Sequence, residues 1–131
     1  MLLLTAMTCQ VPYWTTRNLI FENRTNDTIF LLVGSGKPFN PAEVIEMYED
    51  EWASLILPNG YSTESMLDAE ERIVYCALLK KQTLDNHSKE EIIERDLVEY
   101  YSYSYQDLKK IDFKIVYSGE NPTDSAPATS M

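Results

Sequence analysis

The 131 residues suffice for one domain with a real hydrophobic core, because folding at this size buries roughly two-thirds of the surface that the unfolded chain exposes. The 21 acidic and 11 basic residues give a formal net charge of −10, which repels phosphate backbones and argues against a nucleic-acid partner. No apolar stretch reaches the roughly 18 residues that predict a transmembrane helix.

Residues 1–8, MLLLTAMT, form an apolar opening that leads directly into Cys9. This pattern is similar to the end of a bacterial lipoprotein signal peptide, although no basic residue precedes the apolar stretch. We expect residues 1–9 to be a shortened signal segment with Cys9 as the lipidation site, and residues 10–17 to be a tether. The alternative interpretation is a short N-terminal strand in which Cys9 is an ordinary buried cysteine.

Two apolar, β-branched segments follow, at residues 18–22 and 28–33. The five polar residues between them suit a hairpin loop, so the pattern predicts a β-hairpin. Alternation with a period of two places Ile29, Leu31 and Val33 on one face of its second strand.

A short helix is expected from about residue 41 to residue 50. Asn40, Pro41 and Glu43 have the residue types of a capped helix start. Helical spacing places further side chains near one stripe, which supports the helix: Val44, Met47, Tyr48, Glu51, Trp52 and Leu55.

The middle of the chain predicts three more strands. Residues 55–57 form a short apolar run that we expect to be buried, and Asn59-Gly60 predicts a turn after which residues 61–66 return as its partner. Residues 72–79 are apolar on both faces of an extended segment, which is typical of a central strand. A polar loop with His87 follows, and Ser88 then opens a short helix.

The last ordered stretch predicts strand, helical turn and strand. Residues 97–103 alternate as a strand, Ser104 and Asp107 form a short capping box, and residues 113–117 alternate again. Residues 118–131 are small, polar and proline-rich, so we expect a disordered tail. The whole predicts a mainly β domain over residues 18–117: a β-sandwich, immunoglobulin-like or transthyretin-like, with about seven strands and one or two short helices.

Residue types suited to catalysis are scarce. One histidine and two distant cysteines do not supply the ligands of a zinc site, so we expect no bound metal or other cofactor. A dense group of tyrosines could instead form a binding face for a glycan or a protein: Tyr100, Tyr101, Tyr103 and Tyr105. The alternative, which we favour, is that these rings fill the core and its rim.

The segments NLIFENRTNDTIFLLV and ERDLVEYYSYSYQDLKKIDFKIVY resemble the first hairpin and the closing motif of small Bacteroides-type envelope proteins. The resemblance implies a β-sandwich lipoprotein of the cell envelope, facing the periplasm or on the outer membrane, held to the membrane by its lipid anchor only. We therefore expect a binding or accessory module for a glycan or an envelope protein rather than an enzyme. The alternative function is a small hydrolase that uses paired acidic side chains.

Overall fold

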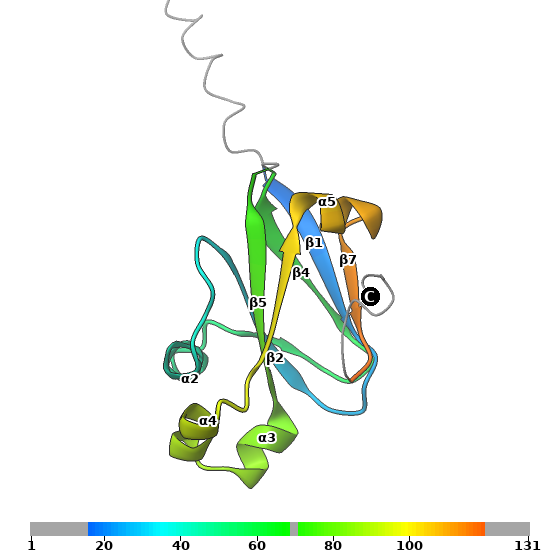
Figure 1. Cartoon of the computed structure of the whole chain (residues 1–131). Helices are drawn as coiled ribbons and strands as arrows, with labels where there is room; N and C mark the ends of the chain where they lie inside the picture. The colour runs from blue at the N-terminus through cyan, green and yellow to red at the C-terminus, as the bar shows by residue number, and fades with distance from the viewer. Residues whose placement is uncertain (1–15, 69–70, 120–131) are drawn as a thin grey trace, which may run out of the picture.

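The computed structural model describes residues 16–68 and 71–119, which fold into seven strands and four short helices (Figure 1). In chain order these elements are β1 (Thr16–Asn23), β2 (Ile29–Ser35), α2 (Pro41–Glu49), β3 (Ser54–Ile56), β4 (Tyr61–Leu67), β5 (Ile73–Lys80), α3 (Lys81–Asn86), α4 (Lys89–Arg95), β6 (Glu99–Ser104), α5 (Tyr105–Lys110) and β7 (Lys114–Tyr117). The expected mainly β class is confirmed. The described residues hold four helices, however, where one or two were expected.

The strands make two sheets. In the three-stranded sheet, with the order β4-β1-β7, β1 runs antiparallel to β4 and parallel to β7. The four-stranded sheet has the order β3-β2-β5-β6 and is antiparallel throughout. Each sheet therefore has two edge strands, β4 and β7 in one and β3 and β6 in the other.

The predicted hairpin is half right. Both of its segments are strands, and Ile29, Leu31 and Val33 share the face that lies against the core. The two strands do not pair with each other, however, because β1 belongs to the three-stranded sheet and β2 to the other. The polar residues between them therefore carry the chain from one sheet to the next.

The main core lies between the two sheets. Every strand contributes to it, and α5 closes one end (Figure 1). Its buried side chains are Leu19, Phe21, Ile29, Leu31, Ile56, Met66, Val74, Cys76, Leu78, Tyr103, Tyr105, Leu108, Phe113, Ile115 and Tyr117.

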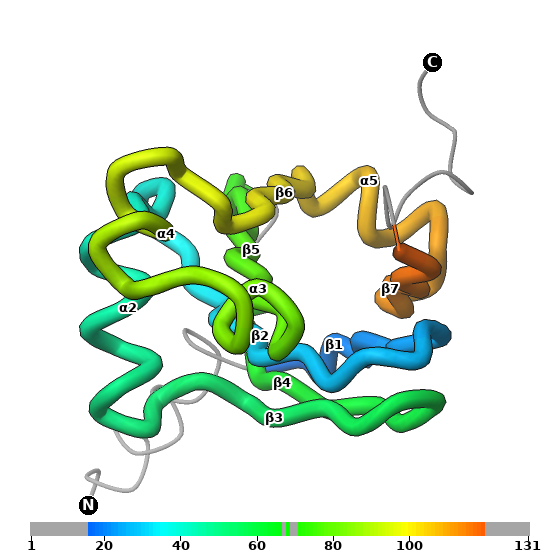
Figure 2. Tube along the Cα trace, turned by 90° about the horizontal axis from the view of Figure 1, so that it is seen from below, coloured from blue at the N-terminus to red at the C-terminus, as the bar shows by residue number. Residues whose placement is uncertain are grey.

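A second apolar cluster lies on the outer face of the four-stranded sheet, beneath the helices. Val44 and Ile45 of α2 and Ile92 of α4 pack there against Ala77 and Leu79 of β5. Figure 2 shows α2 and α4 at the opposite side of the molecule from β7. Because β5 contributes residues to both clusters and lies between β2 and β6, its prediction as a central strand is confirmed.

Local sequence signals placed most of the helices. Asn40 caps α2 through a capping box with Glu43, and Ser104 caps α5 through a capping box with Asp107. Ser88 caps α4 by accepting a hydrogen bond from the backbone N–H of Glu91. Helix α3 was not predicted, and its first residue has no side-chain cap that a sequence pattern could reveal.

Residues 55–60 differ from expectation. Of the apolar run, only Ile56 is buried, whereas Leu55 and Leu57 are exposed. The turn at Asn59-Gly60 forms, with the Gly60 N–H donating to the Leu57 carbonyl at 2.9 Å. It joins strands of different sheets, because β4 pairs with β1 rather than with β3.

Candidate binding surface

Of the four tyrosines proposed as a binding face, three belong to β6, where they lie on both faces of the strand, and Tyr105 is the first residue of α5. Tyr103 and Tyr105 are buried in the main core, and Tyr101 packs against the same core from the inner face of the strand. Strand alternation turns Tyr100 to the outer face, where 36% of the residue is exposed. The four rings therefore share no single surface, and Tyr100 is the most exposed of them.

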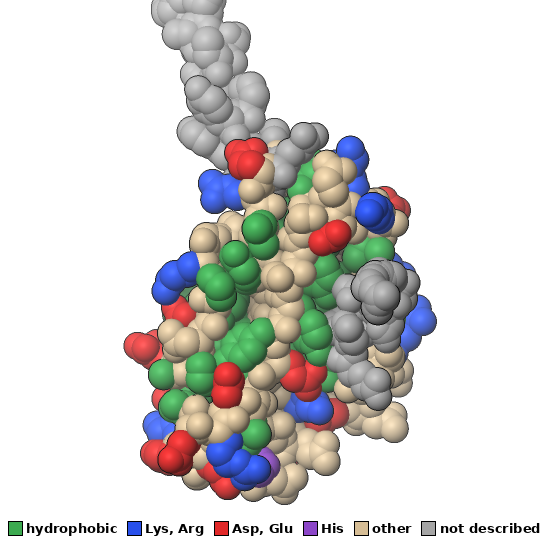
Figure 3. Space-filling model, viewed as in Figure 1, with side chains coloured by type: hydrophobic (Ala, Val, Ile, Leu, Met, Phe, Trp, Pro, Cys, Tyr) green, Lys and Arg blue, Asp and Glu red, His purple; other side chains and the backbone are tan. Residues whose placement is uncertain are grey.

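On the outer face, Tyr100 lines a shallow groove of about 210 Å³ with Phe39, Tyr75 and Ser102. The Phe39 ring lies over Gly34, where an added Cβ would come within 3.2 Å of the ring. The Tyr100 hydroxyl donates a hydrogen bond to the Asp96 carboxylate at 2.8 Å. Burial is the larger cause and this carboxylate the smaller cause of a raised pKa of the Tyr100 phenol. Figure 3 shows hydrophobic side chains gathered over β5 and β6 on this face.

Glu99 joins the two sheets at their β6 and β7 edges. Its carboxylate accepts hydrogen bonds from the Tyr101 hydroxyl at 2.7 Å and the Tyr117 hydroxyl at 3.0 Å, and it pairs with Lys80 at 3.2 Å. Lys80 and Tyr117 also line a polar cleft of about 530 Å³. Through these three partners, the Glu99 carboxylate holds the edges of the two sheets together.

The two acids in that cleft are also engaged. Asp27 accepts a hydrogen bond from the backbone N–H of Gln82 at 3.2 Å, and Asp85 pairs with Lys81 at 2.8 Å. Both carboxylates therefore serve local structure: Asp27 caps the start of α3, and Asp85 bridges one turn of that helix.

The largest apolar side chains at the protein surface gather between the end of α2 and the start of β4. Four of the six exposed large hydrophobic residues of the described chain lie in this segment, which we call the 52–61 surface. They are Trp52 (72% exposed), Leu55 (56%), Leu57 (60%) and Tyr61 (69%).

The backbone explains why these side chains face outward. Helix α2 ends at Glu49, and Glu51 adopts a left-handed φ of 64°, which redirects the chain before Trp52. Strand β3 then places Ile56 in the core, so alternation turns Leu55 and Leu57 away from it. Trp52 and Leu55, which helical spacing placed near the stripe of α2, lie beyond the end of that helix.

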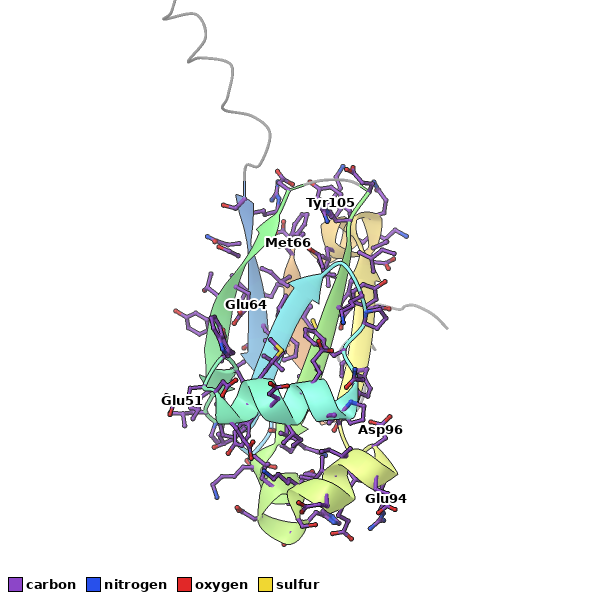
Figure 4. The ribbon with its side chains drawn as sticks, turned by 90° about the vertical axis from the view of Figure 1, so that its left-hand side faces the viewer. Glu51, Glu64, Met66, Glu94, Asp96 and Tyr105 are labelled. Carbon is purple, nitrogen blue, oxygen red and sulfur yellow. The ribbon has the colours of Figure 1, made fainter. Side chains whose placement is uncertain are left out.

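A groove of about 420 Å³ adjoins the 52–61 surface. Its lining includes Phe30 and Tyr48, whose rings meet edge to face with centroids 4.8 Å apart. Glu49 and Glu51 also line it, and Glu49 pairs with Lys89 at 3.0 Å. Figure 4 shows Glu51 at the end of α2, on the side away from Glu94.

Reactive groups are few in the described part of the chain. His87 pairs with Glu91 at 3.0 Å, and burial raises the pKa of the Cys76 thiol to about 12. Within residues 16–68 and 71–119, no three His, Cys, Asp or Glu side chains are grouped so that they could hold a metal ion. Crossing a bilayer takes about 20 apolar residues, and none of the helices in those ranges offers such a stretch. Cys9 and the tail from residue 120 onward lie outside the described residues.

Comparison with family models, curated proteins and solved structures found no match to this chain.

Proposed function

We propose that this protein is a non-catalytic binding module that recognises another protein through the 52–61 surface. The observation that carries the proposal is the concentration of four exposed large hydrophobic side chains within ten residues of sequence. Isolated exposed hydrophobic residues are ordinary, whereas grouped ones mark interaction sites. Trp52 and Tyr61 are of the residue types that most often dominate binding energy, because their rigid rings lose little conformational entropy.

The resemblance described above supports a place for this module in the cell envelope. In this proposal Cys9 carries a lipid, and the two sheets form a β-sandwich of the immunoglobulin-like or transthyretin-like type. The tether, expected over residues 10–17, is limited to residues 10–15, because Thr16 and Arg17 belong to β1. Lipid attachment would hold the protein on a membrane surface, since each buried methylene contributes about 0.8 kcal/mol. Labelling with a fatty-acid analogue in cells that express the gene should mark the wild type and spare Cys9→Ala. Equal labelling of the two would remove the anchor.

The binding proposal is tested by comparing three purified baits in detergent extracts of the source cells. Trp52→Ser removes the most exposed ring of the surface, and Ile73→Ser removes an exposed apolar side chain at the start of β5 as a matched control. Both are surface changes, so each should alter the free energy of unfolding by only about 0.5 kcal/mol. We expect a protein that the wild type and Ile73→Ser retain and Trp52→Ser loses, with direct binding then measured by calorimetry. Recovery that does not differ among the baits would contradict the proposal.

A glycan is the second candidate ligand, and the groove beneath Tyr100 favours it. Phe39 and Tyr75 offer aromatic faces for the C–H groups of a sugar ring, and Ser102 offers a hydroxyl for its polar groups. Titration of labelled protein with a panel of monosaccharides, followed by NMR, should move the amide signals of β5 and β6. Unchanged signals at millimolar sugar would remove this candidate.

A further inference from the structure

The end of α2 carries an unusual concentration of negative charge. Glu49, Asp50 and Glu51 are consecutive, and the last turn of the helix holds no basic residue. The helix dipole makes this end negative as well, so cations are the groups that it favours. Glu49 pairs with Lys89, whereas the Glu51 carboxylate makes no hydrogen bond or ion pair with any residue that the structure describes.

The adjoining groove combines that charge with apolar and aromatic side chains in its lining. Phe30, Tyr48 and Leu55 line its interior, and Glu49 and Glu51 supply its carboxylates. Arginine and lysine side chains have the matching construction, since their methylene stems pack on apolar surface and their cationic heads interact with ring faces and carboxylates. The groove therefore complements one type of side chain in both shape and charge.

We propose that the partner inserts an arginine or lysine side chain into this groove while its neighbouring apolar residues cover the 52–61 surface. The inference rests on the proposed function, because it specifies the chemistry of the partner that this surface recognises. The formal charge of −10 supports it at long range, since a negative protein attracts cationic partners and raises their association rate.

Two other occupants lack this complementarity. A second copy of the chain that used the same surface would bring the same carboxylates against each other, and like charges in an interface oppose association. Residues 1–15 and 120–131 of the given sequence contain no lysine or arginine side chain to place in the groove. A cationic segment of another protein is the occupant that fits.

The test uses two capped dipeptides, acetyl-Arg-Trp-amide and acetyl-Cit-Trp-amide. Citrulline has nearly the shape of arginine and no charge, so the difference in affinity between the two peptides measures the contribution of the positive charge. We expect amide signals of Tyr48, Glu51 and Leu55 to shift in NMR titrations of the full chain. The arginine peptide should bind about fivefold more tightly at 20 mM salt, which is the upper effect of one exposed ion pair, and the difference should shrink at about 500 mM salt.

Matched variants locate the effect. Glu51→Gln should weaken the arginine peptide about threefold, whereas Glu94→Gln, the same change at an exposed position of α4, should leave it unaltered. Equal affinity of the two peptides, binding of neither, or shifts elsewhere would overturn the cationic partner. Self-association by sedimentation that Trp52→Ser abolishes would also overturn it, in favour of a second copy. Each of these results is independent of the bait comparison, which tests whether the surface binds a protein at all.

Discussion

Asn23 gives the sharpest test of how the two sheets are joined. It is the one fully buried polar residue among those described, at the end of β1. Its side-chain N–H groups donate to the carbonyls of Asp27 at 2.8 Å, Leu57 at 3.1 Å and Ile56 at 3.2 Å. Its side-chain oxygen accepts from the Thr25 hydroxyl at 2.7 Å and backbone N–H at 3.0 Å. The Asn23 side chain therefore links the connection between β1 and β2 to the turn between β3 and β4.

Asn23→Ala should lower the free energy of unfolding by roughly 2 to 5 kcal/mol. The amide has two N–H groups, so at least two carbonyls in buried or partly buried hydrogen bonds lose a donor, and each such loss costs about 1 to 3 kcal/mol. Urea unfolding followed by circular dichroism measures the loss. Asn18→Ala is the control, because Asn18 is exposed on the same strand and its replacement should cost about 0.5 kcal/mol or less.

The isosteric variant Asn23→Asp tests the direction of the hydrogen bonds. Its carboxylate would face carbonyl oxygens and donate nothing, so it should be less stable than Asn23→Ala at pH 7. Burial raises the pKa of such a carboxyl in the folded state, so the folded protein takes up a proton before the unfolded chain does. The penalty relative to wild type should therefore shrink as pH falls from 7 toward about 4. A loss below about 1 kcal/mol for Asn23→Ala, or a pH-independent penalty for Asn23→Asp, would refute this account.

Three further results are expected. Leu108→Ala should lower the free energy of unfolding in urea by about 2 to 4 kcal/mol, because the Leu108 side chain of α5 is fully buried in the core. A loss under about 1 kcal/mol would contradict that burial. Cys76 should resist iodoacetamide at pH 8 until the protein unfolds, because burial raises its thiol pKa to about 12, and fast labelling of its peptide in native protein would count against this burial. A hydrogen bond from Tyr105, followed in size by one from Arg17, holds the pKa of Asp68 below its usual 3.8. The ionised Asp68 therefore stabilises the folded protein above pH 3.8, and this stabilisation is lost as the pH falls through the lowered pKa of the folded state. Asp68→Asn should therefore lower the melting temperature at pH 7 but not near pH 2, and an equal difference at both would exclude the carboxylate as the cause.

Local patterns predicted the elements well because the forces that form them act over three or four residues. The capping boxes at Asn40 and Ser104 each join a side chain to a backbone N–H three positions later, and both were legible in the sequence. The sequence did not show in the same way which strands pair with one another. Residues 23–27 suit a hairpin loop as well as a crossing between sheets, and the hydrogen bonds of Asn23 that fix the crossing reach 33 and 34 residues along the chain.

The candidate binding surface was harder to predict for a related reason. Apolar residues such as Trp52, Leu55 and Leu57 predict burial, and only the placement of neighbouring elements shows that nothing described covers them. Alternation along β6 places Tyr100 on the opposite face from Tyr101 and Tyr103. It could not identify Phe39 and Tyr75, which come from other parts of the chain, as the neighbours of Tyr100.

The edges of the two sheets bear on how a partner would be recognised at the 52–61 surface under the proposed function. An exposed edge strand can pair with a foreign strand, and short strands or inward-pointing charges prevent this. Strands β3 and β7 have only three and four residues. The longer edges carry inward carboxylates: Glu64 of β4 shares the inner face with Met66 (Figure 4), and Glu99 of β6 shares it with Tyr103. Every edge thus has a feature that disfavours strand addition, so recognition at the β3 and β4 side must come from side chains, and Trp52, Leu55, Leu57 and Tyr61 are the exposed apolar side chains there.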